Sequence, residues 1–217
     1  GVDLANVDND TYRSIRNALI DNLVVLIRDQ NISDAELVAF SQLFGDLDLA
    51  PPQENGQQAV NGLPEIMVIS NVKENGVPIG SLGDGEAIWH TDMNYVDVPP
   101  IGSALYSLEI PDHGGNTGFC NMYMALDALP ADLRAKLEGL SIKHDSSMTS
   151  GGFLRAGMDE VIDVSKCPGA IHPIIRTHPE SSREVLYLGR RLNAYIMGMA
   201  VDESEALLDE IWQHTTR

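Results

Sequence analysis

The stretch EAIWHTDMNYV, residues 86–96, places a histidine and an aspartate two positions apart, His90 and Asp92. The apolar residues around them predict a β-strand over residues 87–92, in which side chains at i and i+2 point to the same face. An imidazole nitrogen and a carboxylate oxygen side by side match two adjacent ligands of the 2-His-1-carboxylate metal site. The spacing therefore indicates a metal site, with a surface ion pair or a carboxylate-bound histidine as the alternative.

The residues next to this pair indicate that it faces a cavity. Trp89 and Thr91 would lie on the opposite face of the predicted strand, where Trp89 provides a large apolar side chain for a core. Further on, GGNT at residues 114–117 leads into a second predicted strand, from which Thr117 would present its hydroxyl to the same cavity. The same four residues are also common in hairpin turns, so that alternative stays open.

Short strands and a few helices are expected to position these residues. Helical spacing and a Ser33–Glu36 capping box predict helices at residues 11–20, from Ser33 onward, at 124–140 with a new turn at Pro130, and at 202–217. Strands or extended chain are expected at 23–28, 66–70, 87–92, 103–110, 117–122, 172–178 and 184–188. This pattern favours a mainly β sandwich or barrel with flanking helices. The Gly- and Ser-rich residues 145–170 predict a long loop or lid.

Composition narrows the classes of protein and partner. With 217 residues, 43% of them hydrophobic, the chain is expected to form one domain over residues 1–217. Asp and Glu outnumber Lys and Arg by 32 to 14, and the net charge of −18 disfavours nucleic acid and anionic membrane surfaces as partners. The sequence has no apolar run of about 18 residues and no signal for export, so we expect a soluble, cytoplasmic protein.

Several motifs in order along the chain resemble one enzyme family. These are WHTD at residues 89–92, PP at 99–100, GGNT at 114–117 and HPIIRTHP at 172–179. Together they are similar to the taurine dioxygenase / 2,4-dichlorophenoxyacetate dioxygenase (TauD/TfdA) family of Fe(II)- and 2-oxoglutarate-dependent dioxygenases, and the resemblance runs over residues 1–217. It implies a double-stranded β-helix, or jelly roll, with flanking helices.

The resemblance also implies roles for individual residues. His90 and Asp92 match two ligands of Fe(II), and Thr117 matches the threonine that binds a carboxylate of the cosubstrate 2-oxoglutarate. Such an enzyme uses O₂ to hydroxylate an unactivated C–H of a small organic molecule, and converts 2-oxoglutarate to succinate and CO₂. Related halogenases carry a small residue in place of the carboxylate, so Asp92 favours hydroxylation. A homo-oligomer, dimer or tetramer, is expected by resemblance alone.

Two elements of the family pattern are not found in this sequence. The family's third ligand, a histidine, and its arginine for 2-oxoglutarate have no match, and none of the other histidines stands in the right context (His113, His144, His172, His178 and His214). We expect the third ligand C-terminal to residue 217, so that the C-terminal part of the jelly roll is absent from this chain. Two alternatives stay open: a catalytically inactive jelly-roll ligand-binding protein, and a cupin-like metalloenzyme that does not use 2-oxoglutarate.

Substrate choice is expected to depend on residues near the metal pair. Glu86, four residues before His90, lies where taurine-specific members have a neutral amide that contacts the substrate. A carboxylate beside an anionic sulfonate would be repulsive, so taurine is not the expected substrate. Asn71 is a second candidate for the substrate pocket.

Overall fold

Contacts between Cα atoms divide the chain into two units, which we call the N-terminal unit (residues 1–85 and 100–114) and the C-terminal unit (86–99 and 115–217). The structure is a computed structural model, and it describes residues 1–50, 59–82, 88–155, 157–189 and 192–216. The expectation of one domain over residues 1–217 stays a prediction.

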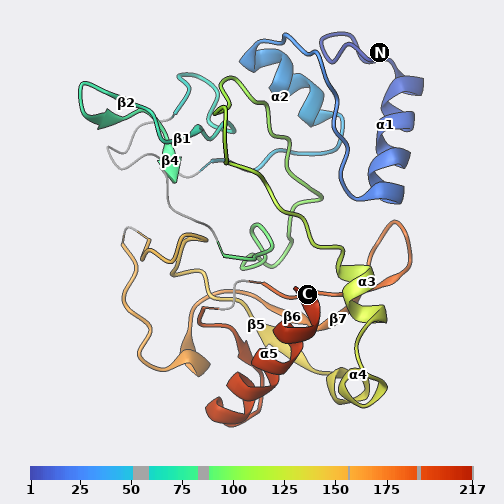
Figure 1. The fold of residues 1–217 in the computed structure, drawn as a ribbon, viewed down its shortest axis with the longest axis vertical. Coiled ribbons are helices and arrows are strands. Elements are labelled where there is room, and N and C mark those ends of the chain that lie inside the picture. The colour runs from blue at the N-terminus through green and yellow to red at the C-terminus, as the bar shows by residue number, and fades with distance from the viewer. Residues whose placement is uncertain (51–58, 83–87, 156, 190–191, 217) are drawn as a thin grey trace. The chain divides into compact units, whose positions relative to one another are not determined.

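The described residues of the N-terminal unit form two helices and four very short strands, most of which are labelled in Figure 1. In chain order they are α1 (Asn9–Asn22), α2 (Asp34–Gln42), β1 (Ile69–Ser70), β2 (Lys73–Glu74), β3 (Val77–Pro78) and β4 (Ser81–Leu82). The predicted capping box of α2 is confirmed, because the backbone N–H of Glu36 donates to Ser33 Oγ (3.3 Å) and the Glu36 carboxylate accepts from the Ser33 N–H (2.7 Å). Strand β1 pairs with β4 in parallel, and β2 pairs with β3 antiparallel.

Three strands predicted in this unit differ from the structure. Residues 23–28 and 103–110 are irregular, and the strand predicted at 66–70 shortens to β1. Alternating apolar residues give a segment the propensity for a strand, but a strand forms only where a second segment pairs with its N–H and C=O groups. Leu105 and Leu108 accordingly stay exposed in this unit.

The C-terminal unit contains a small antiparallel sheet packed against helices (Figure 1). Its elements are α3 (Met122–Asp127), α4 (Ala131–Leu137), β5 (Ser141–Lys143), the 3-10 turn η1 (Val164–Lys166), β6 (Ile171–Pro173), β7 (Ile175–Thr177), β8 (Glu184–Leu186), β9 (Tyr195–Ile196) and α5 (Val201–Thr215). Strand β5 lies between β6 and β9, and β7 pairs with β8.

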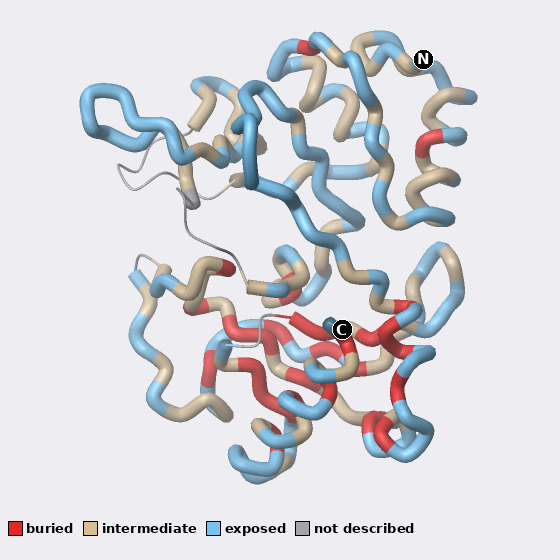
Figure 2. Tube along the Cα trace, viewed as in Figure 1, coloured by how far each residue is buried: buried red, intermediate tan, exposed pale blue. Residues whose placement is uncertain are grey.

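The hydrophobic core of the described residues belongs to this second unit. Figure 2 shows buried positions gathered there, whereas Ile15 and Ile32 are the buried hydrophobic residues described in the N-terminal unit. One cluster joins α3, α4, α5 and the strands, and its largest fully buried members are Leu126, Leu133, Leu137, Ile142, Ile174, Leu186, Leu188, Ile196, Leu208 and Ile211. These residues make the sheet and the helices one packed scaffold.

Other predictions for the C-terminal unit are confirmed in part. The helical region 124–140 forms two helices, since α3 ends before Pro130 and α4 begins directly after it. The strands predicted at 87–92 and 117–122 are wrong: the described residues 88–91 are irregular, a turn begins at Asp92, and irregular chain runs from 117 into α3. The described residues of 145–170 are irregular apart from the bridge between Met148 and Leu154 and the turn η1.

Candidate metal centre

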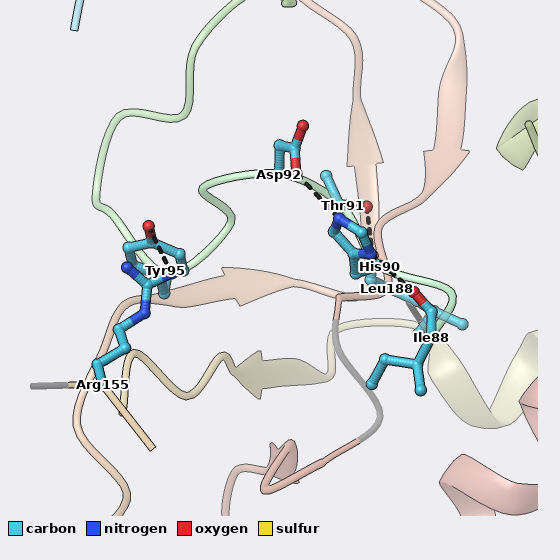
Figure 3. Close-up of polar contacts among 7 residues, drawn as sticks. All are labelled: Ile88, His90, Thr91, Asp92, Tyr95, Arg155 and Leu188. Carbon is cyan, nitrogen blue, oxygen red and sulfur yellow. Dashed lines mark hydrogen bonds and ion pairs between the residues drawn. The ribbon is translucent and has the colours of Figure 1, made fainter. Parts of the chain in front are cut away.

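The structure brings His90 and Asp92 together although they do not lie in a strand. His90 Nε2 and Asp92 Oδ1 are 3.0 Å apart, and His90 Nδ1 is 2.7 Å from the carbonyl oxygen of Ile88 (Figure 3). A carbonyl oxygen only accepts, so Nδ1 carries a proton and donates to it. Nε2 is then the ring nitrogen that faces the carboxylate, and in the neutral tautomer its lone pair would be available to a metal.

The chemistry of this pair fits a divalent metal ion. Two lone-pair atoms 3.0 Å apart need a shared cation or a proton between them. On an octahedral ion with bonds of about 2.1 Å, adjacent ligand atoms lie about 3.0 Å apart. Within the described ranges, no group of three His, Cys, Asp or Glu side chains is arranged to hold an ion. His90 and Asp92 therefore lie as two adjacent ligands of a metal ion would, and a further ligand would be needed to complete such a site.

Backbone and side-chain contacts fix the turn that carries the pair. Thr91 Oγ1 donates to the carbonyl of Leu188 (2.7 Å), a contact drawn in Figure 3. Met93 has a left-handed backbone (φ 48°), and the N–H of Val96 closes the turn on its carbonyl (3.2 Å). The chain thus reverses directly after Asp92, and this reversal rather than the pleat of a strand places the carboxylate beside the imidazole.

The far end of the turn is held by Tyr95. Its hydroxyl accepts from Arg155 Nη2 (3.0 Å), the guanidinium lies 4.6 Å from its ring centroid, and its carbonyl accepts from the N–H of Ala170 (3.0 Å). Figure 3 shows the Tyr95–Arg155 contact on the same turn as the metal pair. Residues 155 and 170 belong to the predicted loop 145–170, so this loop supports the turn.

A pocket of about 240 Å³ opens beside His90. Its lining is mostly apolar and aromatic: Trp89, His90, Thr91, Gly118, Phe119, Cys120, Met122, Leu188 and Trp212. A Cβ atom placed on Gly118 would lie 3.1 Å from the Trp89 ring, so the two segments touch here. Thr117 directly precedes this lining and is exposed, which puts it on the segment that faces His90. Trp89 itself is 46% exposed, so its predicted place in a core is wrong.

A larger hollow of about 730 Å³ lies elsewhere in the C-terminal unit, between residues 161–164 and α5. It carries the carboxylates of Asp163, Glu205 and Asp209 together with apolar side chains. We assign the chemistry to the smaller pocket because His90 lines it, whereas the larger hollow contains no imidazole.

Two further residues were predicted for the substrate pocket, Asn71 and Glu86. Asn71 is an exposed residue of the N-terminal unit that follows β1, and Glu86 lies outside the described residues. The fold also adds residues that the sequence reasoning missed. Leu188 accepts from Thr91 beside the turn, and Asn94, on the turn itself, bonds to His144; both partners are far away in the sequence, so no local pattern indicates them.

Comparisons with known proteins point to one family. The profile described as "Taurine catabolism dioxygenase TauD, TfdA family" matches residues 1–217. The (S)-phenoxypropionate/alpha-ketoglutarate-dioxygenase of Sphingobium herbicidovorans is 30% identical over 97% of this chain and 72% of its own length. The alpha-ketoglutarate-dependent 2,4-dichlorophenoxyacetate dioxygenase of Cupriavidus pinatubonensis is 30% identical over 94% of this chain and 73% of its own length.

A solved structure agrees with these relatives. The crystal structure of a taurine dioxygenase from Burkholderia xenovorans superposes with a TM-score of 0.73 at 32% identity, and covers 100% of this chain and 68% of the solved chain. These matches cover 94–100% of the present chain and 68–73% of each of the three proteins.

Proposed function

The chain belongs to the TauD/TfdA family of alpha-ketoglutarate-dependent dioxygenases, and from that premise we propose that His90 and Asp92 hold its Fe(II). The observation that carries the proposal is the 3.0 Å approach of His90 Nε2 to Asp92 Oδ1, with the other ring nitrogen fixed by the Ile88 carbonyl. We expect the third ligand, a histidine, and an arginine for the cosubstrate C-terminal to residue 217.

The residues of this chain would hold the Fe(II), the 2-oxoglutarate and the substrate. When bound, Fe(II) and 2-oxoglutarate supply the activation of O₂ that hydroxylates the substrate, with release of succinate and CO₂. His90 and Asp92 give the metal a nitrogen and an anionic oxygen ligand on one side. The Thr117 hydroxyl would donate to a carboxylate of 2-oxoglutarate, and the apolar and aromatic lining of the pocket would contact the substrate.

The proposed fold is a double-stranded β-helix in which these short strands take part. Support comes from the solved taurine dioxygenase, whose superposition covers 100% of this chain at a TM-score of 0.73. Among the described residues, no helix is long and apolar enough to cross a membrane. A cytoplasmic location and a homo-oligomeric assembly stay predictions.

The substrate is a small organic molecule, and two relatives suggest which compounds to test first. They are named for aryloxyalkanoates, and the pocket beside His90 offers the aromatic side chains of Trp89, Phe119 and Trp212 to such a ring. Taurine is expected to be a poor substrate because Glu86 would repel its sulfonate.

Succinate release over a substrate panel tests the proposal. The protein is given Fe(II), 2-oxoglutarate, O₂ and, in turn, aryloxyalkanoates, alkyl sulfonates and taurine, and substrate-dependent succinate is measured. Asp92→Ala is expected to abolish this release because it removes an anionic ligand. Asp97→Ala is the matched control, since Asp97 is an exposed carboxylate on the same stretch. Equal turnover by the Asp92 variant and the wild type would contradict the assignment.

A further inference from the structure

A buried polar pair lies directly behind the metal-bearing turn. Asn94, two residues after Asp92, is 1% exposed, and its Nδ2 donates to Nδ1 of His144, which is also 1% exposed (2.7 Å). His144 directly follows β5, the central strand of the sheet in the C-terminal unit. The pair therefore connects the turn to the end of the central strand of this sheet.

The protonation state of His144 allows its Nδ1 to accept the hydrogen bond from Asn94. Burial, together with the nearby His172, lowers the pKa of His144 from 6.5 to about 3, so its ring is neutral at pH 7. A neutral imidazole has one N–H and one lone pair. Because Nδ1 accepts from Asn94, Nε2 carries the proton.

The backbone of Gly189 packs directly against the side chains of Asn94 and His144. A methyl group at Gly189 would overlap both Asn94 Nδ2 and His144 Nδ1. The preceding residue, Leu188, accepts the hydroxyl of Thr91. One short segment thus contacts the turn on both sides of Asp92, through Thr91 before it and Asn94 after it.

A second buried histidine holds the end of the same turn. His172 Nε2 donates to the carbonyl of Val96 (2.9 Å), and the rings of His172 and His144 lie 5.5 Å apart. His144, directly after β5, and His172, in the neighbouring strand β6, therefore contact residues 94 and 96. These contacts leave the residues that follow Asp92 little freedom to move.

Stability alone does not account for this arrangement. Within the described part of the chain, Asn94 Oδ1, His144 Nε2 and the hydroxyl of Tyr187 are buried without a hydrogen-bond partner. Each such group costs about 1–3 kcal/mol, and an apolar packing of the same shape would avoid this cost. The buried histidines instead make hydrogen bonds to the turn, from Asn94 to His144 and from His172 to the Val96 carbonyl.

We propose that Asn94 and His144 are positioning residues for the metal site, which hold the turn so that Asp92 stays beside His90. The inference rests on the proposed function, in which His90 and Asp92 bind the metal. In this role Asn94 and His144 do not bind the metal themselves but support the residues that do. Loss of such a supporting hydrogen bond typically weakens metal affinity about 10- to 100-fold.

Binding of Mn(II) alone, followed by the EPR signal of the free ion, tests the inference. Asn94→Ala and His144→Leu each remove one half of the bond and are expected to raise the dissociation constant about 10- to 100-fold. His144→Asn places an amide oxygen near the position of Nδ1, so it keeps an acceptor for Asn94 and should retain most of the wild-type affinity.

Ser204→Ala is the control for a general loss of stability. Ser204 is also 1% exposed, and its hydroxyl accepts from the N–H of Ile196 in β9 (2.9 Å), so its loss breaks a buried hydrogen bond that does not involve the turn. Its Mn(II) dissociation constant is expected to match the wild type. Hydrogen exchange without metal gives a second measurement: the Val96 amide should exchange faster in Asn94→Ala and at the wild-type rate in Ser204→Ala.

The outcomes separate this inference from the proposed function. If the wild type does not bind Mn(II), the metal assignment of His90 and Asp92 fails, and the inference fails with it. If the wild type binds but Asn94→Ala and His144→Leu bind equally well, the inference alone is overturned. It is also overturned if Ser204→Ala weakens binding as much, or if His144→Asn binds no better than His144→Leu. If His144→Leu does not fold, the Mn(II) dissociation constants of Asn94→Ala and His144→Asn still test the inference.

Discussion

At the scale of residues, His90 and Asp92 lie side by side, as their spacing predicts, but on a turn and not on a strand. His90 and Asp92 were expected on one face of a strand, yet a turn brings them to 3.0 Å. The two-residue spacing serves either arrangement, because a reversal after Asp92 also returns its side chain toward the imidazole. The supporting residues were missed because a hydrogen bond such as Asn94 to His144 joins positions 50 residues apart.

The protonation of His144 predicts a pH dependence of stability. Its pKa is lowered to about 3 in the fold, whereas an unfolded histidine titrates near 6.5, so between these values the unfolded chain binds a proton that the folded chain does not. His144 therefore favours folding above pH 6.5, and this advantage is lost as the pH falls. The unfolding free energy should fall by up to about 1.4 kcal/mol per pH unit from this group.

Urea unfolding of the wild type and of His144→Asn between about pH 7 and about pH 5 measures this contribution. The variant lacks the titrating ring, so the difference between the two proteins should shrink as the pH is lowered. Parallel pH dependences for the two proteins would show that His144 is not held neutral by the fold.

At the scale of elements, helices were predicted well and strands poorly. The Ser33–Glu36 capping box and the break at Pro130 depend on neighbouring residues, and both are found. The irregular segments at 103–110 and 117–121 have the composition of strands, but a strand also depends on a distant partner that composition does not specify. For the same reason the sequence predicted only strand or extended chain at residues 184–188, where the structure has β8 paired with β7.

The capping box gives a prediction at this scale. Ser33→Ala removes the side chain that accepts from the N–H of Glu36 and should lower the unfolding free energy by about 1 kcal/mol. Ser41→Ala, in the last turn of the same helix, loses a hydroxyl that donates to the carbonyl of Leu37 within the helix and should have a smaller effect. Chemical denaturation of both variants measures the comparison, and an equal loss would argue against the cap.

At the scale of the whole molecule, the C-terminal unit contains both the main core and the metal pair. Its helices and sheet bury one hydrophobic cluster, and the turn with His90 is attached to that scaffold through Leu188. The family could be predicted from ordered motifs along the whole sequence, because each motif is short but their order is specific. The division into two units could not, since it depends on contacts between distant residues.

Core packing predicts which substitutions destabilise this unit. Leu133 is 1% exposed, so Leu133→Ala should lower the unfolding free energy by about 2–5 kcal/mol through lost burial and the cavity it leaves. Met124 is 66% exposed on the neighbouring helix, and Met124→Ala should change it by less than about 0.5 kcal/mol. Denaturant titration measures both, and similar losses would contradict the assigned core.

The central claim is that His90 and Asp92 bind the iron of a 2-oxoglutarate-dependent dioxygenase. Anaerobic addition of Fe(II) and 2-oxoglutarate, followed by visible absorption, tests it most directly. The wild type should develop the weak charge-transfer band of iron-bound 2-oxoglutarate, and Asp92→Ala should not. A wild-type protein that shows no band, or an Asp92→Ala variant with the same band, would contradict the claim.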